Sequence, residues 1–451
     1  MDVEILSRIQ FAFTVMFHYI YPPMSIGLAV LLIFMEGMFL KTGNPMFERM
    51  TKFWVKIFAL TFAMGVATGI VMEFEFGTNW ATYSRYVGDV FGSALAAEGI
   101  FAFFLESGFL AILLFGWDKV GPKMHFFSTI MVAAGAHLSA VWIVVANSWM
   151  QTPTGFHIVG EGMNARAEII DFWAMVFNPS SIERLSHTIG GAWICGAFLV
   201  ISVSAYYLLK NRHVELSRSS FKIGLSLAAF ASLFQLITGH SSAVQVGEYQ
   251  PAKMAAYEGH YNTEPGDLYL FGWVFDSEQK VIGIKIPGML SVLLYMDSSK
   301  PVTGLNEFPP EDRPPINLVF QTYHLMVALG MYFIAFIVIG IFLLWRNKLF
   351  KTAWFMKLSV ASVILPHIAN QAGWVSAEVG RQPWIVYNLL RTSDGLSKVV
   401  SAENVLFSLI LFTLIYALLF VLFLYLLDSK IKHGPEDEHN EPVVEQLVKA
   451  Q

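Results

Sequence analysis

Glu378 and Arg381 are the most chemically suggestive pair in the sequence, within the stretch GWVSAEVGRQPW that closes a long apolar segment. Placing a carboxylate at the end of an apolar segment costs free energy unless a cation pairs with it. Arg381 follows Glu378 by one helical turn, so it can neutralise the carboxylate or hold another anionic group. From these residues alone, a Glu–Arg pair that only closes a helix end is an equally good interpretation.

Three further residues inside apolar segments are candidate metal ligands. His18 lies in FHYIYPPMSIGL, where the double proline predicts a kink, and His187 lies in SHTIGGAWICGAF. Met326 lies in HLMVALG, with Gly330 one turn further on. Histidine and methionine together can ligate a low-spin haem iron. Glycines one turn beyond His187 and Met326 would leave room for a flat macrocycle. Close helix packing, a hydrogen-bonded core histidine and a core methionine are the alternatives.

Two carboxylates, Glu98 and Glu106, share the apolar segment AAEGIFAFFLESGFL. Being eight residues apart, they would lie about 12 Å from one another along a helix and loosely on one side of it. This spacing predicts a proton relay bridged by water, whereas the alternative is that neighbouring helices cap each carboxylate. Lys56, Asp118 and His125 lie toward one end of the relay. They could form the entrance for protons or simply a solvent-exposed surface.

The composition places all of these residues in a polytopic membrane protein. The chain of 451 residues is 55% hydrophobic and 14% charged, with a mean hydropathy of +0.55, which is too apolar for a soluble globular protein. Apolar stretches long enough to cross about 30 Å of hydrocarbon as helices lie near residues 12–40, 53–73, 93–116, 126–146, 187–209, 220–239, 317–345, 355–374 and 402–427. We therefore predict an all-α membrane fold of about nine transmembrane helices, mostly packed as two four-helix bundles.

The distribution of basic residues predicts the orientation. Lysine and arginine gather in the connections that follow odd-numbered spans, for example Lys41 and Lys119. The positive-inside rule makes those connections cytoplasmic, so the N-terminus is expected outside and the C-terminus inside. Residues 1–427 would form the membrane domain. The acidic tail 428–451 is expected to be a mostly disordered cytoplasmic end.

This orientation brings the candidate ligands to one depth. His18, His187, Met326 and Glu378 all fall toward the outer ends of their spans. The single cysteine, Cys195, excludes a disulfide within the chain, a Cys-x-x-Cys-His haem attachment and cysteine-held iron–sulfur clusters. A redox cofactor would therefore be held by His, Met or Glu.

An outer loop of about 77 residues, 240–316, lies over this layer and is too long for a simple connector. Its beginning is polar and partly helical, and Lys253 and Glu258 offer a hydrogen-bond donor and a proton acceptor there. Its later part is proline-rich, and we expect it to be irregular. The loop is expected to form a substrate site, with a docking surface for another subunit as the alternative.

Taken together, the motifs closely resemble subunit I of cytochrome bd-type quinol oxidases. The resemblance covers essentially the whole chain and is carried, in this order, by FHYIYPP, FGTNWATYSRYVGDVFG, EGIFAFFLES, GWDK, VANSWMQTP, SHTIGGAW, QPAKMAAYE, HLMVALG and GWVSAEVGRQPW. Two departures are visible. His324 stands two residues before Met326, where many members carry arginine, and the loop after the sixth span is the short form.

The resemblance implies a set of cofactor ligands. It assigns His187 and Met326 to a low-spin haem b, and His18 and Glu378 to two high-spin haems, a haem b and a haem d, where oxygen is reduced. Which of the two binds which high-spin haem stays open. Relatives called cyanide-insensitive oxidases keep these ligands while lacking haem d, so a further haem b in its place also stays open.

The resemblance also implies where quinol and protons react. Lys253 and Glu258 match the loop implicated in quinol oxidation. Trp374 matches an aromatic residue between haems, and Arg381 suits a haem propionate. Glu98 and Glu106 match carboxylates near the haem pair. The expected proton path from the cytoplasm comprises Lys56, Asp118, Ser139, Glu106 and Glu98.

The expected activity is that of a terminal oxidase, which oxidises membrane quinol and reduces dioxygen to water. Proton uptake from the cytoplasm would generate proton motive force without pumping. The expected partners are subunit II, a small single-span subunit, ubiquinol or menaquinol, dioxygen and the lipid of a bacterial or archaeal cytoplasmic membrane, with no nucleic acid. The alternatives are a non-oxidase b-type cytochrome subunit of a quinol-linked dehydrogenase and a proton-coupled transporter without haem.

Overall fold

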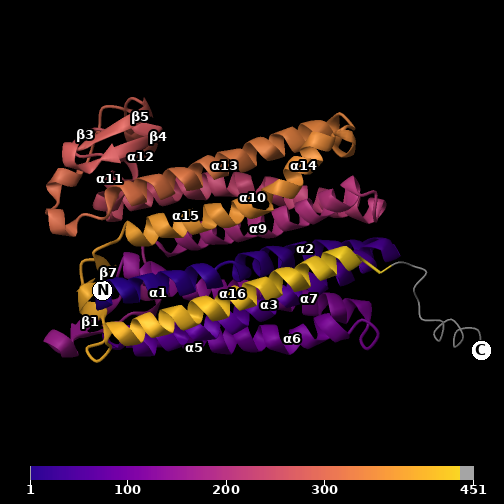
Figure 1. Cartoon of the computed structure of the whole chain (residues 1–451), viewed down its shortest axis with the longest axis horizontal. Helices are drawn as coiled ribbons and strands as arrows, with labels where there is room; N and C mark the ends of the chain where they lie inside the picture. Colours follow the sequence, from indigo (N-terminus) through magenta and orange to yellow (C-terminus); the bar gives the residue numbers. More distant parts are fainter. Residues whose placement is uncertain (1, 437–451) are drawn as a thin grey trace, which may run out of the picture.

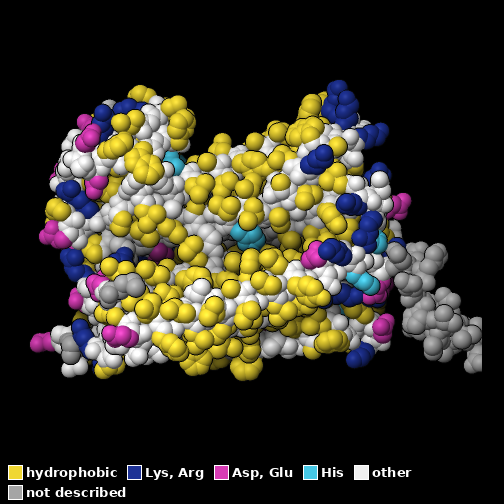
Figure 2. Space-filling view, viewed as in Figure 1, with side chains coloured by type: hydrophobic (Ala, Val, Ile, Leu, Met, Phe, Trp, Pro, Cys, Tyr) yellow, Lys and Arg dark blue, Asp and Glu magenta, His cyan; other side chains and the backbone are white. Residues whose placement is uncertain are grey.

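The computed structural model describes residues 2–436 and consists mainly of long, nearly parallel helices. Figure 1 shows an elongated bundle with the N-terminus at one end and the end of α16 (Ala402–His433) at the other. We call these ends the N-terminal face and the C-terminal face. Hydrophobic side chains cover the visible length of the bundle, whereas charged side chains gather at its two ends (Figure 2). The predicted all-α membrane fold is therefore confirmed.

Eight helical segments of the described chain are long and apolar enough to cross a membrane. They are Val3–Thr42, Pro45–Thr78, Gly88–Phe115, Pro122–Gln151, Ser181–Leu209, Val214–Tyr249, Pro310–Trp345 and Ala402–His433. The span predicted near residues 355–374 is divided into α14 (Ala353–Ala361) and α15 (Leu365–Val379) by a 3-10 turn. Pro366 favours this break, because proline has no backbone N–H to continue a helix. The count of nine spans stays a prediction, since it depends on this divided helix.

The first half of the chain forms one helical group. It contains α1 (Val3–His18), α2 (Tyr21–Thr42), α3 (Pro45–Thr78), α4 (Ala81–Tyr86), α5 (Gly88–Glu98), α6 (Phe104–Phe115) and α7 (Pro122–Gln151). A π-helical segment, Gly99–Phe103, joins α5 to α6. Only Tyr19 and Ile20 separate α1 from α2, so the helix is interrupted where the double proline predicts a kink.

The second group contains α9 (Ser181–Leu209), α10 (Val214–Tyr249), α13 (Ile316–Trp345), α14 and α15. The two groups lie side by side, and α16 packs against α1 and α3 of the first group (Figure 1). Because α16 continues to His433, residues 428–433 are helical and do not belong to a disordered tail, contrary to the prediction. Residues 434–436 follow the helix, and the rest of that predicted tail, 437–451, lies outside the described residues.

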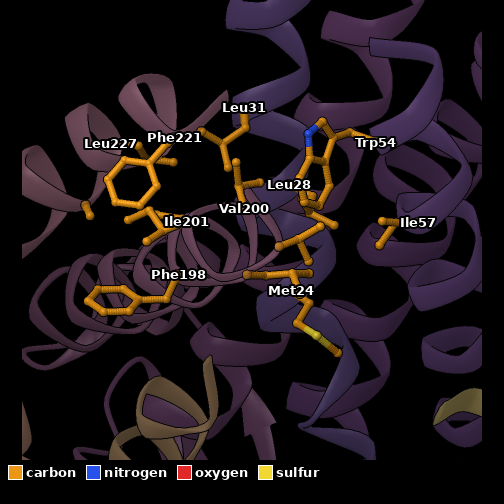
Figure 3. Packing of buried hydrophobic residues seen from close by; sticks show 14 of the residues in the cluster. Met24, Leu28, Leu31, Trp54, Ile57, Phe198, Val200, Ile201, Phe221 and Leu227 are labelled. Carbon is orange, nitrogen blue, oxygen red and sulfur yellow. The ribbon is translucent and has the colours of Figure 1, made fainter. Parts of the chain in front are cut away.

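The two groups meet where α2 packs against α9. A Cβ atom on Gly27 would lie 2.4 Å from the carbonyl oxygen of Ala192, and one on Gly196 would lie 2.4 Å from the carbonyl carbon of Gly27. Glycine at both positions therefore permits one backbone to approach the other closely. Figure 3 shows the surrounding core, which includes Met24, Leu28, Leu31, Trp54, Ile57, Phe198, Val200, Ile201, Phe221 and Leu227.

Short strands and helices cover the N-terminal face (Figure 1). β1 (Phe156–Val159) pairs with β2 (Arg166–Ile169), and α8 (Phe172–Val176) follows them. β7 (Trp384–Val386) pairs with β8 (Leu390–Arg391) shortly after the end of α15. These segments lie at the same face as the end of α15, where the candidate site is found.

The loop predicted at residues 240–316 begins later than expected, because α10 continues to Tyr249. Its first part forms α11 (Pro251–Glu258), as a partly helical start predicts. Its later part is not irregular, contrary to the prediction. It contains β3 (Glu264–Pro265), β4 (Leu268–Phe275), β5 (Lys280–Ile286), α12 (Met289–Tyr295) and β6 (Pro301–Val302), with β3 paired to β6 and β4 paired to β5. Aromatic and β-branched residues on both sides of the polar turn DSEQ are the signal for this hairpin.

Candidate active site

Glu378 lies in the last turn of α15, where four donors surround its carboxylate. Its Oε2 atom lies 2.6 Å from Nη2 of Arg381, so the predicted ion pair is present. Its Oε1 atom lies 3.3 Å from Nη2 of Arg184, 3.2 Å from Nδ2 of Asn147 and 3.0 Å from Nε2 of Gln151. Three helices, α7, α9 and α15, therefore converge on one carboxylate.

The two arginines of this cluster retain unused hydrogen-bond donors. Nε and Nη1 of Arg381 and Nε of Arg184 are buried and have no partner among the described residues. Buried guanidinium donors without a partner are costly, and they suit the oxygens of a second anion. The cluster thus does more than close a helix end, because it carries positive charge and donors beyond those that Glu378 uses.

Lys253 belongs to the same cluster. Its side chain is buried, and its Nζ atom donates to Oε1 of Gln151 at 2.6 Å. Burial and the nearby Arg184 guanidinium hold the pKa of Lys253 well below its ordinary value. A cavity of about 120 Å³ adjoins the ammonium group and is lined in part by Arg381 and Trp384. Lys253 therefore faces the carboxylate of α15 and not the exposed surface of the loop.

Glu258 lies at the other end of α11 and faces a different region. Its Oε2 atom accepts from the backbone N–H of Tyr269 at 2.9 Å and lies 3.8 Å from Nε2 of His324. Its Oε1 atom is buried without a partner among the described residues. Burial raises the pKa of Glu258 to about 8. The structure thus separates Lys253 and Glu258, because five residues along a helix turn two side chains to different sides.

His18 is oriented by a threonine of the next transmembrane helix. Its Nδ1 atom lies 2.9 Å from Oγ1 of Thr68, whose hydroxyl donates to the carbonyl oxygen of Met64 at 2.8 Å. Because the hydroxyl proton is used there, the hydroxyl oxygen accepts from Nδ1–H of the ring. A Cβ atom on Gly69 would lie 3.3 Å from the ring, so this glycine makes room for it.

His187 is held in the same way by α10. Its Nδ1 atom lies 3.2 Å from Oγ1 of Thr238, whose hydroxyl donates to Oε1 of Gln235 at 3.2 Å. A Cβ atom on Gly239 would lie 3.4 Å from the ring. A Thr-Gly pair on the following helix therefore positions each histidine with Nδ1 protonated. The lone pair of Nε2 is then available for a metal ion.

The glycines near the predicted ligands serve different purposes. A Cβ atom on Gly373 would lie 2.8 Å from Sδ of Met326, whereas Gly330 has open space around it. The space beside Gly190 and Gly191, one turn beyond His187, is instead occupied by side-chain amides. A Cβ atom on Gly190 would lie 2.6 Å from Gln235, and one on Gly191 would lie 2.4 Å from Asn370. The packing interpretation therefore holds for Gly190 and Gly191. Of the two interpretations, free space beside a glycine applies only to Gly330, where no other atom lies within 4 Å of an added Cβ atom.

Trp374 links the four candidate ligands. Its ring centroid lies 5.6 Å from that of Tyr19, which follows His18, and 5.5 Å from the guanidinium of Arg184, which precedes His187 by one turn. Met326 packs on the neighbouring Gly373, and Glu378 lies one turn further along α15. Met326, Glu378 and the neighbours of His18 and His187 thus lie around the last two turns of α15.

Glu98 and Glu106 face the same strip of α7. Oγ of Ser139 donates to Oε1 of Glu98 at 2.5 Å, and a Cβ atom on Gly135 would lie 2.8 Å from Cβ of Glu106. The π-helical segment between the two glutamates adds one residue to a turn, so an interval of eight residues acts as an interval of seven. The two carboxylates therefore lie on one side of the helix more closely than a regular α-helix would place them.

The predicted entrance residues lie near the C-terminal face. Lys56 forms an ion pair with Glu436. Lys52, one turn before it, lies 5.0 Å from the ring of Trp117, the neighbour of Asp118 in the turn between α6 and α7. The structure therefore brings Lys56 and Asp118 to the same region.

A buried carboxylate, Glu36, lies between this region and Glu106. Its Oε1 atom lies 2.6 Å from Nδ1 of His125, and its Oε2 atom accepts from Oγ1 of Thr129 at 2.5 Å. Nε2 of His125 approaches the carbonyl oxygen of Leu113, seven residues beyond Glu106 on the same helix. His125 is fully buried, so the interpretation as a solvated face does not apply to it.

Comparisons with known proteins show the family of the chain. The sequence profile of the family described as "Cytochrome bd terminal oxidase subunit I" matches residues 6–435. The chain belongs to this family. The subunit 1 of cytochrome bd ubiquinol oxidase from Bacillus subtilis (strain 168) is 39% identical over 455 residues, covering 98% of this chain and 96% of the relative. The subunit 1 of cytochrome bd-II ubiquinol oxidase from Escherichia coli (strain K12) is 34% identical, covering 99% of each chain.

A solved structure extends the comparison to the fold. The bd oxidase from Geobacillus thermodenitrificans superposes on this chain with a TM-score of 0.90 at 30% identity. The match covers 96% of this chain and 99% of that chain. This bd oxidase subunit therefore shares nearly its whole architecture with a solved member of the family.

Several residues of this bd oxidase subunit were missed by sequence analysis. Arg184 and Gln151 contact Glu378 from other helices, and no local pattern indicates such convergence. Glu36 is a lone carboxylate inside an apolar span, which is the signal that could have found it. Glu75 lies just beyond the predicted span 53–73, two residues after Glu73. Glu75 is buried between α1 and α3, where its Oε1 atom accepts from Oγ1 of Thr14 at 2.8 Å.

Proposed function

We propose that this bd oxidase subunit oxidises a membrane quinol and passes the electrons to dioxygen, which is reduced to water. Two quinols supply the four electrons that one dioxygen needs, and the reaction consumes four protons. The observation that carries the proposal is that Met326, Glu378 and the neighbours of His18 and His187 meet around the end of α15. His, Met and Glu side chains are suited to haem iron, and helices that meet in this way would hold the haems close enough for electron transfer.

The residues present fit haem groups. We assign His187 and Met326 to a low-spin haem b, and His18 and Glu378 to two high-spin haems, one haem b and either haem d or a further haem b. The support lies in the free Nε2 atoms of the histidines, the space beside Gly330 and the unused arginine donors, which suit propionates. When bound, the haems supply one-electron transfer and the iron that binds oxygen. Trp374 lies among these positions.

A visible spectrum of the purified complex tests this proposal. We expect a Soret band, a sharp low-spin haem b band in the reduced-minus-oxidised spectrum, and a high-spin species that binds carbon monoxide. A low-spin spectrum with no carbon monoxide binding would favour a non-oxidase b-type cytochrome subunit. The lack of any Soret band would leave only a transporter.

Thr238→Val is expected to weaken the site of the low-spin haem without removing a ligand. The valine keeps the shape of the side chain but cannot accept from Nδ1 of His187, so the ring loses its orientation. We expect about a tenfold loss of haem affinity at this site, measured as low-spin haem per protein during graded haem depletion. Thr238→Ser retains the hydroxyl and should behave as the wild type. Equal haem retention in the valine and serine variants would contradict the positioning role.

We place quinol oxidation at Glu258 on α11. Its unpaired Oε1 atom can accept a proton from a quinol hydroxyl, and His324 lies beside its other oxygen. Lys253, nearer the start of α11, belongs to the Glu378 cluster and contributes a hydrogen-bond donor there. The quinol is a ubiquinol or a menaquinol.

The raised pKa of Glu258 predicts how quinol oxidation depends on pH. Below a pH of about 8 the carboxyl is mostly protonated and cannot accept a proton, so the rate should rise as the pH increases toward 8 and then level off. Glu258→Gln should lose this rise and should oxidise quinol about 10²-fold more slowly. Glu264→Gln, at an exposed glutamate of the same loop, is the matched control. A pH profile unchanged in Glu258→Gln would remove Glu258 from this step.

We infer that the protons consumed at the haems enter from the C-terminal face, which we assign to the cytoplasm. The path comprises Lys56, Asp118, Glu106, Ser139 and Glu98. The buried pair of Glu36 and His125 lies beside it and extends it toward Glu106. Because electrons enter near the opposite face, this route generates proton motive force without a pump.

We further propose that the subunit works in the inner (cytoplasmic) membrane of a bacterium or archaeon. Its partner is a second oxidase subunit, as the numbering of its relatives as subunit 1 implies. A small single-span subunit completes the assembly. The exposed apolar side chains along the spans provide the surface for lipid and for these partners.

A further inference from the structure

The β4–β5 hairpin exposes an apolar face where a hairpin in water would carry polar residues. Its register pairs Phe271 with Ile284 and Trp273 with Ile282 on the outward side. These four side chains are 59%, 53%, 54% and 54% exposed, respectively. An antiparallel sheet with one face in water normally shows polar residues there, and exposed apolar patches of this kind mark interaction surfaces.

Backbone groups along the edge of β4 fix the depth of the hairpin against α13. Asn317 accepts from the backbone N–H of Val274, and Gln321 donates to the carbonyl oxygen of Gly272 at 2.8 Å. One turn further, Nε2 of His324 approaches the carbonyl oxygen of Tyr269 at 2.9 Å. From residue 317 to residue 324 a helix advances about 10 Å, so β4 runs alongside the first turns of a membrane-spanning helix (Figure 1).

The turn of the hairpin differs in polarity from its outward face. The turn of the hairpin, residues 276–280, is polar and exposed. Asp276 accepts a hydrogen bond from Tyr261, and Gln279 accepts one from Asn306. The opposite end, where Leu268 pairs with Ile286, lies level with His324. The outward face is therefore apolar between the polar turn and the deep end. The ion pair of Lys285 with Asp267 also lies at the deep end, but strand alternation places Lys285 on the other face from Ile284 and Ile286.

Exposed apolar residues also lie on α13 at the level of the hairpin. Leu318 and Leu325 lie seven residues apart on that helix and are 49% and 45% exposed, at the level that the hairpin occupies. Trp273 also has the amphipathic side chain that is enriched at membrane–water interfaces. Hydrophobic side chains cover much of the lobe that contains β4 and β5 (Figure 2).

We propose that the outward face of the β4–β5 hairpin is immersed in the acyl-chain boundary of the leaflet at the N-terminal face, with the hairpin turn in water. The occupants of this face are the acyl chains of phospholipids. The loop that carries Glu258 is then part of the membrane interface and not a domain that stands clear of the bilayer. The argument rests on depth, register and exposure, and it does not depend on the proposed quinol chemistry.

Spin labels on the assembled oxidase test this inference. In a Cys195→Ala background, Ile284→Cys and Ser277→Cys each receive a nitroxide, and the complex is placed in phosphatidylcholine nanodiscs without a reductant. The Cys195→Ala complex without an added cysteine is treated with the same label, which shows how much label attaches to the other subunits. Collisional relaxation by oxygen, which concentrates in lipid, is compared with relaxation by a water-soluble nickel chelate. An unchanged haem spectrum verifies that each variant is folded.

We expect oxygen to relax the label at residue 284 severalfold more effectively than the chelate does, and the opposite order at residue 277. A label at residue 284 that meets the chelate as readily as the one at residue 277 would place the face in water and overturn the proposal. A label at residue 284 that is immobile and shielded from both reagents would also overturn it, since another subunit would then cover the face.

Discussion

Met326→Leu should assemble into the membrane and yet lack the sharp low-spin haem b band. Leucine fills nearly the same volume beside Gly373, so the packing of α13 against α15 is retained and the cost in stability should stay below about 1.5 kcal/mol. It has no sulfur, however, and the iron would lose one of its two axial ligands. The measurement is the reduced-minus-oxidised spectrum of the purified complex, together with its haem content.

Met331→Leu is the matched control for this experiment. Met331 lies on the same helix and is 55% exposed, so it should tolerate leucine with no spectral change. His187→Ala should reproduce the loss seen in Met326→Leu, because the two residues are assigned to the same haem. An unchanged low-spin band in Met326→Leu would refute the ligand assignment.

Glu106→Gln should retain its haems and its quinol site but turn over about 10²-fold more slowly. Glutamine keeps the shape of the side chain beside Gly135, but it cannot release and regain a proton. Since consumed protons must cross hydrocarbon to reach the haems, a blocked carrier limits the rate of oxygen reduction. The membrane potential generated per electron should fall less than the rate. Oxygen consumption and potential are measured together in proteoliposomes.

The exposed Glu215 at the start of α10 supplies a control, because Glu215→Gln removes a carboxylate outside the proposed path. Glu98→Gln should slow turnover similarly. Its haem content is compared with that of Glu106→Gln, since Glu98 lies nearer the proposed haem ligands. Wild-type turnover and unchanged proton uptake in Glu106→Gln would make Glu106 an ordinary buried helix acid.

The sequence was sufficient to predict the features that depend on residue type and local spacing. Charged or ligating side chains inside apolar segments singled out His18, His187 and Glu378, because burial of such groups is costly without a function. The ion pair of Glu378 with Arg381 followed from one helical turn of spacing, and the structure confirms that pair.

Features that depend on packing between helices could not be predicted. Arg184 and Glu378 lie almost two hundred positions apart, and nothing local indicates that they meet. The π-helical segment near Glu98 depends on one extra residue in a turn, which periodicity alone does not reveal. Lys253 and Glu258 were expected to act together, whereas the packing of α11 turns them to different neighbours.

The contact of Gly27 with Gly196 has a consequence for electron transfer. Electron tunnelling falls exponentially with distance, so the rate between two centres is sensitive to small displacements of the protein that holds them. His18 belongs to the first helical group, whereas His187 and Met326 belong to the second. At the Gly27–Gly196 contact itself no side chain lies between the two backbones, so no rotamer change can alter their separation there. On the proposed ligand assignment, this contact would hold constant the distance over which electrons tunnel between the two groups.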